Sequence, residues 1–124
     1  VVEVLTEQVS NAYRAFLRKQ GISYIIAGKT ELDYGLVLSK LKEKFNIETL
    51  MLGGGGVLNW SFLQAGMCDE ISIVLAAAAD GSPDTPPVFR AAEGISESKA
   101  LGFTLKEAKA MDGGAVWLRY GVNR

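Results

Sequence analysis

The chain contains no histidine and only one cysteine, Cys68, among its 124 residues. Without histidine there is no Ser-His-Asp or Cys-His nucleophile pair and no imidazole ligand for a metal. A lone cysteine cannot form an intramolecular disulfide and is typical of a reducing compartment, so we expect a cytoplasmic protein without a metal site. Any chemistry must then come from carboxylates, hydroxyls, backbone groups or a bound cofactor.

An excess of positive charge and long apolar runs are also lacking. The formal net charge is -1 and the pI is near 5.5, which predicts no binding to nucleic acid. No apolar run approaches the roughly 20 residues that span a bilayer, so no membrane partner is expected. The length fits a single domain over residues 1–124. An initiator methionine is missing too, and the sequence opens on an apolar strand already under way, which indicates part of a longer protein.

The first half of the chain alternates predicted strands and helices. Apolar runs predict strands over 1–5, 23–27 and 48–52, and helical spacing of apolar residues predicts helices over 11–20, 34–45 and 57–65. Ser10 and Asp33 are placed to cap the first two helices. The inward face of the third helix is expected to carry Val57, Leu58, Phe62 and Ala65. Three βα repeats predict a mainly parallel sheet covered by helices.

The second half of the chain has a different pattern of predicted elements, in which strands follow one another without intervening helices. A strand is predicted over 70–76, an irregular stretch follows, and two further strands are predicted over 102–108 and 115–122. Asp112, Gly113 and Gly114 between the last two are a hairpin signal. The predicted fold class is therefore α/β, with a mainly parallel sheet and an antiparallel C-terminal hairpin.

Four consecutive glycines, Gly53 to Gly56, follow the third predicted strand and open the third helix. Such a turn exposes backbone N–H groups beside the partial positive charge of a helix N-terminus, which suits a phosphate or pyrophosphate. The alternative is a tight connection in which glycine only relieves crowding, although four glycines exceed what that requires. The Rossmann pattern G-x-G-x-x-G does not apply, because its sixth position falls on Leu58 or Asn59.

Two further residues are placed at the same edge of the predicted sheet, where the strands end. Thr6 follows the first strand and Lys29 the second, and ligands collect at the carboxyl ends of parallel strands. A hydroxyl and an ammonium there suit a ribose or a 2′-phosphate; the alternative is that both are solvated loop positions. No acidic residue is evidently placed to bind a ribose 2′-hydroxyl, which favours NADPH over NADH. Asp69 and Glu70 lie at the opposite end of their strand, so no catalytic carboxylate pair is predicted.

The run over residues 49–63, with its glycine turn and Asn59, resembles the dihydrofolate reductase superfamily. More specifically, it is similar to the riboflavin-pathway reductase family of the RibD C-terminal type. Residues 24–28, 65–70, 79–81 and 116–120 match that group in order. The resemblance implies a three-layer αβα fold and extends over nearly the whole chain.

The resemblance implies an NADPH-dependent reductase, often a homodimer, similar to 5-amino-6-(5-phosphoribosylamino)uracil reductase and acting on a pterin- or pyrimidine-like substrate. It also implies a cis peptide bond between Gly53 and Gly54. Carried over by position, the cofactor-binding residues are Thr6, Gly28, Lys29, Leu52, Gly53, Gly54, Gly55, Gly56, Val57 and Leu58.

The sequence departs from this family at two positions. Gly53 stands where riboflavin-pathway members usually carry a glutamate that faces the substrate, and Ala77 stands where they carry a proline. The family's first strand and helix, which carry most substrate contacts, are expected upstream of Val1, so no catalytic residue is assigned. The alternative function is a non-catalytic nucleotide-binding or dimerisation module of the same fold.

Overall fold

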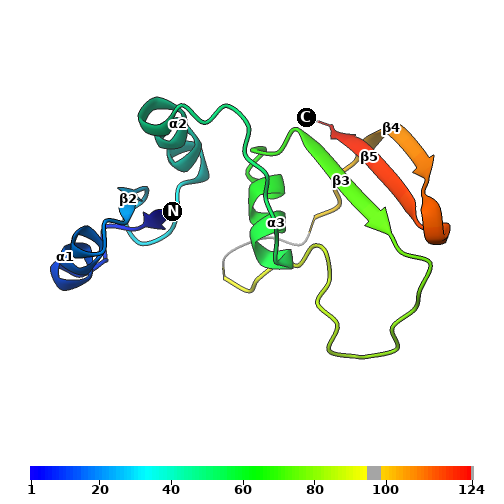
Figure 1. Cartoon of the computed structure of the whole chain (residues 1–124), viewed down its shortest axis with the longest axis horizontal. Coiled ribbons are helices and arrows are strands. Elements are labelled where there is room, and N and C mark those ends of the chain that lie inside the picture. The colour runs from blue at the N-terminus through cyan, green and yellow to red at the C-terminus, as the bar shows by residue number, and fades with distance from the viewer. Residues whose placement is uncertain (95–98, 124) are drawn as a thin grey trace. The chain divides into compact units, whose positions relative to one another are not determined.

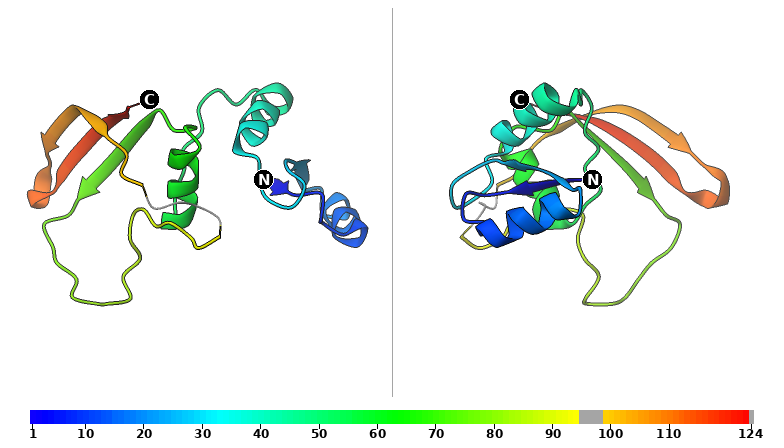
Figure 2. Two further views of the ribbon diagram at one scale, coloured as in Figure 1. Left: turned by 180° about the vertical axis from the view of Figure 1, so that it is seen from behind. Right: turned by 60° about the vertical axis from the view of Figure 1, so that its left-hand side comes forward.

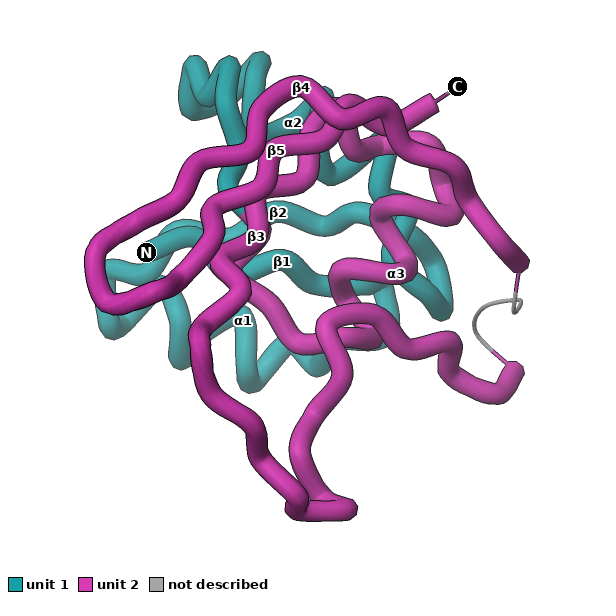
Figure 3. Tube along the Cα trace, turned by 90° about the vertical axis from the view of Figure 1, so that its right-hand side faces the viewer, with its two compact units in different colours: residues 1–51 teal, residues 52–124 magenta. Residues whose placement is uncertain are grey.

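A computed structural model describes residues 1–94 and 99–123 of the chain. The chain forms two compact units, residues 1–51 and residues 52–124 (Figure 3). Figure 1 labels the helices and the strands from β2 on, and Figure 3 also labels β1. Each unit is described by itself below.

Unit 1 consists of two successive βα repeats. The strand β1 (Val2–Leu5) is followed by the helix α1 (Asn11–Lys19), then by β2 (Ser23–Ile26) and α2 (Tyr34–Phe45). The two strands pair in parallel, with partners running from Val2 and Ser23 to Leu5 and Ile26. Ile25, Ala27, Val37 and Leu41 form the buried core between β2 and α2. The first two predicted βα repeats are confirmed.

The helices of unit 1 begin at the predicted caps. Ser10 Oγ accepts a hydrogen bond from the backbone N–H of Tyr13 at 3.1 Å, and Asp33 Oδ1 accepts one from that of Leu36 at 2.9 Å. Both bonds satisfy a donor that a helix N-terminus otherwise leaves unpaired. Helix α2 ends at Asn46, which adopts the left-handed conformation with φ of 54°.

Unit 2 packs one helix against a three-stranded antiparallel sheet. The helix α3 (Gly56–Gln64) precedes β3 (Glu70–Leu75), β4 (Phe103–Ala110), the short 3₁₀ turn η1 (Asp112–Gly114) and β5 (Val116–Val122). The strand order is β3-β5-β4, so β5 is central, as two further views show (Figure 2). Trp60 and Leu63 of α3 pack on Ile71 of β3 to form the core of this unit. The predicted C-terminal hairpin is confirmed.

The third predicted strand, over 48–52, is wrong. This segment has no regular secondary structure and pairs with no strand of the described residues. Leu50 and Met51 within it are 41% and 88% exposed. A β-prone run becomes a strand only when a neighbour supplies hydrogen bonds. Parallel pairing is therefore limited to β1 and β2, and the described strands form two sheets. The α/β class, with parallel and antiparallel pairing, is confirmed.

The predicted inward face of α3 is also wrong in part. Val57 and Leu58 are 37% and 39% exposed, whereas Trp60 and Leu63 are buried. Because α3 is apolar on almost every side, its sequence contains little periodic contrast from which to choose the buried face.

Candidate nucleotide site

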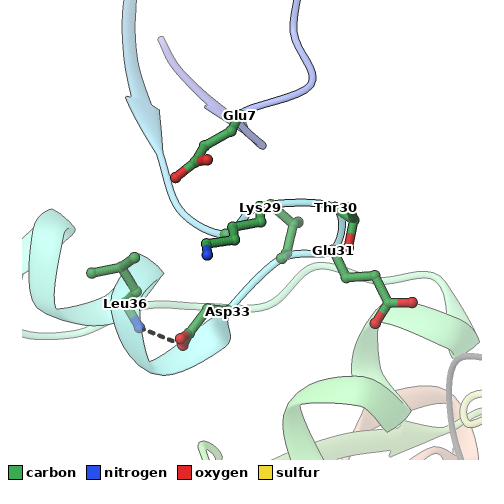
Figure 4. Close-up of a pocket in the computed structure, with 8 residues that line it drawn as sticks. Glu7, Lys29, Thr30, Glu31, Asp33 and Leu36 are labelled. Atoms are coloured by element: carbon green, nitrogen blue, oxygen red, sulfur yellow. Dashed lines mark hydrogen bonds between the residues drawn. The ribbon is translucent and has the colours of Figure 1, made fainter.

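A groove of about 570 Å³ lies at the carboxyl ends of β1 and β2 in unit 1 (Figure 4). Its lining comes from the loop after β1, from the loop after β2 and from the first turn of α2, and we call it the strand-end groove. The side chains that define it are Glu7, Lys29, Thr30, Glu31, Asp33 and Leu36. The carboxyl edge of the parallel pair is where the sequence predicted ligand-binding loops.

Gly28 shapes the back of the strand-end groove. Its φ is 118°, and a Cβ there would lie 1.8 Å from the carbonyl oxygen of Glu31. The backbone N–H of Glu7 donates to the Gly28 carbonyl at 2.9 Å, and the N–H of Asp33 donates to that of Ala27 at 3.1 Å. The loop after β2 thus folds back on itself and accepts only glycine at this position.

A positioning contact that sequence analysis missed holds the loop after β1. A terminal nitrogen of Arg14 donates to the carbonyl oxygen of Val9 at 3.2 Å and to that of Glu7 at 3.5 Å. Since the N–H of Glu7 is also bonded to Gly28, its backbone is tied from both sides. The sequence of a loop does not indicate that an arginine five to seven residues away donates hydrogen bonds to its carbonyl groups.

The structure brings the predicted residues Gly28 and Lys29 together in the strand-end groove, with Glu7 lining it in place of Thr6. The sequence showed no acidic residue evidently placed to bind a ribose 2′-hydroxyl, but Glu7, Glu31 and Asp33 also line this groove. That ground for favouring NADPH over NADH therefore no longer holds. In Figure 4 the side chains of Glu7, Lys29 and Asp33 project into the same space, whereas the Glu31 carboxylate points away. The Lys29 ammonium forms no ion pair with any described residue.

The glycine turn lies in unit 2 and opens α3. Gly55 is the N-cap of this helix and offers no side chain to its N–H groups. A Cβ built on Gly53, Gly54 or Gly55 meets no atom within 4 Å, so crowding does not explain these three glycines. Gly54 does require glycine for its backbone, with φ of 119°. The turn thus leaves open space beside backbone donors, which is what a bound phosphate needs.

Gly56, in contrast, is explained by packing. A Cβ there would lie 2.6 Å from the carbonyl oxygen of Pro87. The N–H of Arg90 donates to the Gly56 carbonyl at 3.0 Å, and Asn59 Nδ2 donates to the Val88 carbonyl at 3.0 Å. Residues 87–90 are therefore fastened to the first turn of α3. Asn59 matched the family pattern, and this hydrogen bond gives it a structural role.

The predicted cis bond between Gly53 and Gly54 is wrong, since every peptide bond between described residues is trans. The positive φ of Gly54 lets the chain turn with trans peptides.

The charged residues of unit 2 are engaged with one another on the open face of its sheet. Arg119 Nε and a terminal nitrogen each donate to a Glu70 carboxylate oxygen at 2.9 Å. Arg119 also pairs with Glu107 at 3.1 Å, and Lys106 with Glu70 at 3.3 Å. The hydrogen bonds from Arg119 and Lys106 hold the pKa of Glu70 below its ordinary value. Glu70 thus belongs to a surface ion-pair network.

Cys68 packs at the edge of the unit 2 core, as predicted. Burial raises the pKa of its thiol, which disfavours the nucleophilic thiolate. Among residues 1–94 and 99–123, no cluster of three or more acidic, histidine or cysteine side chains is arranged to hold a metal ion. No helix in that part of the chain is long and apolar enough to span a bilayer.

Comparison with curated proteins finds two reductases. The chain is 36% identical over 95 residues to the 2,5-diamino-6-ribosylamino-4(3H)-pyrimidinone 5′-phosphate reductase of Methanothermobacter thermautotrophicus. It is 26% identical over 96 residues to the protein of the same name from Aquifex aeolicus. These matches cover 76% and 77% of this chain but only 43% and 42% of the relatives. The chain thus spans less than half the length of the relatives it matches.

Solved structures show the same fold at lower identity. A pyrimidine reductase-like protein from Corynebacterium diphtheriae superimposes with a TM-score of 0.76 at 17% identity, over 100% of this chain and 50% of that one. RibD from Acinetobacter baumannii gives 0.73 at 19% identity, over 98% and 37%. The profile of the RibD C-terminal domain matches residues 2–117. Because this match includes both units, the chain belongs to the RibD C-terminal domain family.

Proposed function

We propose that this chain is the nucleotide-binding part of a nicotinamide-dependent reductase, with NADPH as the reduced cofactor. The observation that carries the proposal is the open glycine turn before the uncapped helix α3, in a member of a reductase family. Three of its glycines are not needed for packing, and Gly53 is not needed for a positive φ either. A ligand that approaches the backbone closely would explain why these positions carry no side chain.

The residues present fit a dinucleotide. The N–H groups of Gly53 to Gly55 and of the first turn of α3 would hold its pyrophosphate, since a helix N-terminus favours negative charge. Gly28 and Lys29, which line the strand-end groove, would hold the adenosine end together with Thr6, which precedes the lining residue Glu7. Leu52, Val57 and Leu58 would supply apolar contacts near the glycine turn. When bound, the cofactor supplies a hydride; these residues bind and orient it and limit access of water.

For the substrate we propose a pyrimidine-like compound with a phosphorylated ribose-derived chain, reduced at a C=N or C=O group. The two curated relatives are named for such a compound. We also propose that the protein works in the cytoplasm as a homodimer and that residues 1–124 act as a single domain. Catalytic residues are not assigned.

The experiment is calorimetric titration of NADPH and NADH into the protein. Replacing Gly53 by leucine places a side chain in the open space of the turn without strain on φ. We expect micromolar NADPH binding that Gly53→Leu weakens at least tenfold. Gly81→Leu is the matched control, because Gly81 also has an ordinary φ and open surroundings. A folded protein that binds neither nucleotide contradicts the proposal.

A non-catalytic module of the same fold is the second candidate, and Gly53 is the observation that favours it. The family's acidic side chain at this position is absent. NADPH oxidation in the presence of a pyrimidine substrate separates the two, because a module binds the nucleotide without turning it over.

A further inference from the structure

The strand-end groove presents charges of opposite sign to the same space. The carboxylate of Glu7 and the ammonium of Lys29 both project into it, from the loops that follow β1 and β2 (Figure 4). Neither charge is neutralised within the groove, since Lys29 forms no ion pair with a described residue. Asp33 is already engaged, because its Oδ1 accepts the N–H of Leu36 at 2.9 Å. Glu7 and Lys29 are therefore two charged side chains of the groove that no described ion pair engages.

The backbone of Glu7 is held in place before any ligand arrives. Its N–H is bonded to the Gly28 carbonyl at 2.9 Å, and its carbonyl accepts from Arg14 at 3.5 Å. Gly28 is itself fixed by the close approach of the Glu31 carbonyl. A side chain on a backbone tied at both sides loses less freedom on binding than one on a free loop.

The Glu7 carboxylate and the Lys29 ammonium favour different groups on a ribose. A carboxylate accepts hydrogen bonds from vicinal hydroxyls and repels a phosphate, whereas an ammonium attracts a phosphate as a point charge. Both charges line the same groove, so a ligand there meets both at short range, where salt screens them less than distant charges. Glu7 and Lys29 thus act in opposite directions on a nucleotide with a 2′-phosphate.

We infer that Glu7 is a specificity-determining residue of the strand-end groove: it accepts the ribose hydroxyls of a dinucleotide and lowers the preference for a 2′-phosphate that Lys29 creates. The inference rests on the proposed function and deepens it. It names the group that each side chain meets, and it assigns a role to a carboxylate that the sequence did not single out.

The test measures dissociation constants for NADPH and NADH with the wild-type protein and three variants. Glu7→Gln removes the opposing charge, so we expect NADPH to bind about fivefold more tightly and NADH to bind equally or more weakly. Lys29→Met removes the ammonium and is expected to weaken NADPH about tenfold while leaving NADH unchanged. Glu31→Gln is the matched control: it changes the net charge equally, but its carboxylate points away from Lys29.

The outcomes separate the inference from the proposed function. If both nucleotides bind but Glu7→Gln changes their affinity ratio no more than Glu31→Gln does, the inference is overturned and the proposed function stands. If the folded wild-type protein binds neither NADPH nor NADH, both the inference and the proposed function are overturned. Raising the ionic strength gives a second readout: the gain from Glu7→Gln must shrink as salt screens the charges.

Discussion

The two units treat the N-terminus of a helix in opposite ways. In unit 1, α2 begins after the Gly28 loop, and Asp33 caps it with a side-chain carboxylate. In unit 2, α3 begins after the glycine turn, and Gly55 leaves its first N–H groups without a side-chain cap. A capped helix satisfies its own donors, whereas an uncapped one keeps them for an anion from outside. Backbone donors are thus left open at α3, whereas charged side chains line the groove beside the first turn of α2.

The two units also differ in whether their charged side chains form ion pairs. The Lys29 ammonium stays without an ion-pair partner among the described residues, while Arg119 of unit 2 is shared between Glu70 and Glu107. Charged side chains that pair with one another stabilise a surface modestly, and unpaired ones are available to a ligand.

The largest expected effect is on the loop of unit 1. Gly28→Ala places a Cβ 1.8 Å from a carbonyl oxygen at a φ of 118°, so we expect a loss of roughly 3 kcal/mol in the free energy of unfolding. Gly21→Ala is the control, because Gly21 has φ of 67° but no atom within 4 Å; about 1 kcal/mol is expected there. Urea denaturation measures both. Equal losses would show that the loop relaxes around Gly28.

Giving α3 the kind of cap that α2 already has is the next test. Gly55→Asp has room for its side chain and supplies a carboxylate to the free N–H groups. Because Gly55 has φ of -27°, outside the usual range of a residue with a Cβ, we expect no gain in unfolding stability. NADPH affinity should fall about tenfold or more, because the carboxylate competes with the phosphate. Gly55→Ala lacks the charge and must weaken NADPH less. Unchanged NADPH affinity in Gly55→Asp would mean that the phosphate binds elsewhere.

The converse test removes the side-chain cap from α2 and so leaves its first N–H groups open, as they are in α3. Asp33→Ala is expected to cost about 1 kcal/mol in thermal unfolding and to strengthen NADPH binding, because it frees helix donors and removes a negative charge from the strand-end groove. Ser10→Ala removes the cap of α1 instead. It should lower stability by a similar amount with no change in affinity. Weaker NADPH binding in Asp33→Ala would argue that the cap shapes the groove.

The smallest effect concerns the paired charges of unit 2. Because the folded pKa of Glu70 is lowered, its carboxylate contributes stability above its ordinary pKa of 4.5, and that contribution is lost as pH falls through the folded value. Glu70→Gln should therefore be less stable than wild type at pH 7, with the gap closing below about pH 4.5. Thermal melts across that range test it, with Glu48→Gln, an exposed glutamate, as control. A gap independent of pH would assign the loss to packing.

Local signals in the sequence predicted the local structure well. The caps at Ser10 and Asp33, the stop at Asn46 and the C-terminal hairpin all depend on residues close in sequence, and all are confirmed. The strand over 48–52 is not, because its formation depends on a neighbour that no local pattern specifies.

In the candidate site, too, features set by neighbouring residues were predicted, and those set by distant contacts were not. The glycine turn was visible in the sequence as four glycines before a helix, and the loop of Gly28 and Lys29 as a strand end. Glu7 was visible only as part of a loop, since which side chain of a loop enters a groove depends on backbone contacts such as that between Glu7 and Gly28. The contact of Asn59 with Val88 joins residues 29 positions apart, beyond any local pattern.

The central place of β5 in unit 2 has a consequence for synthesis of the chain. Both β3 and β4 pair only with β5 among the described strands, and β5 follows them in sequence. During translation β3 must wait for more than forty residues before its partner emerges, whereas β1 meets β2 across one short helix. The strands of unit 1 can therefore pair early in synthesis, whereas Ile71 and Ile73 of β3 lack their partner strand until β5 is made, which prolongs the exposure of apolar side chains that favours aggregation.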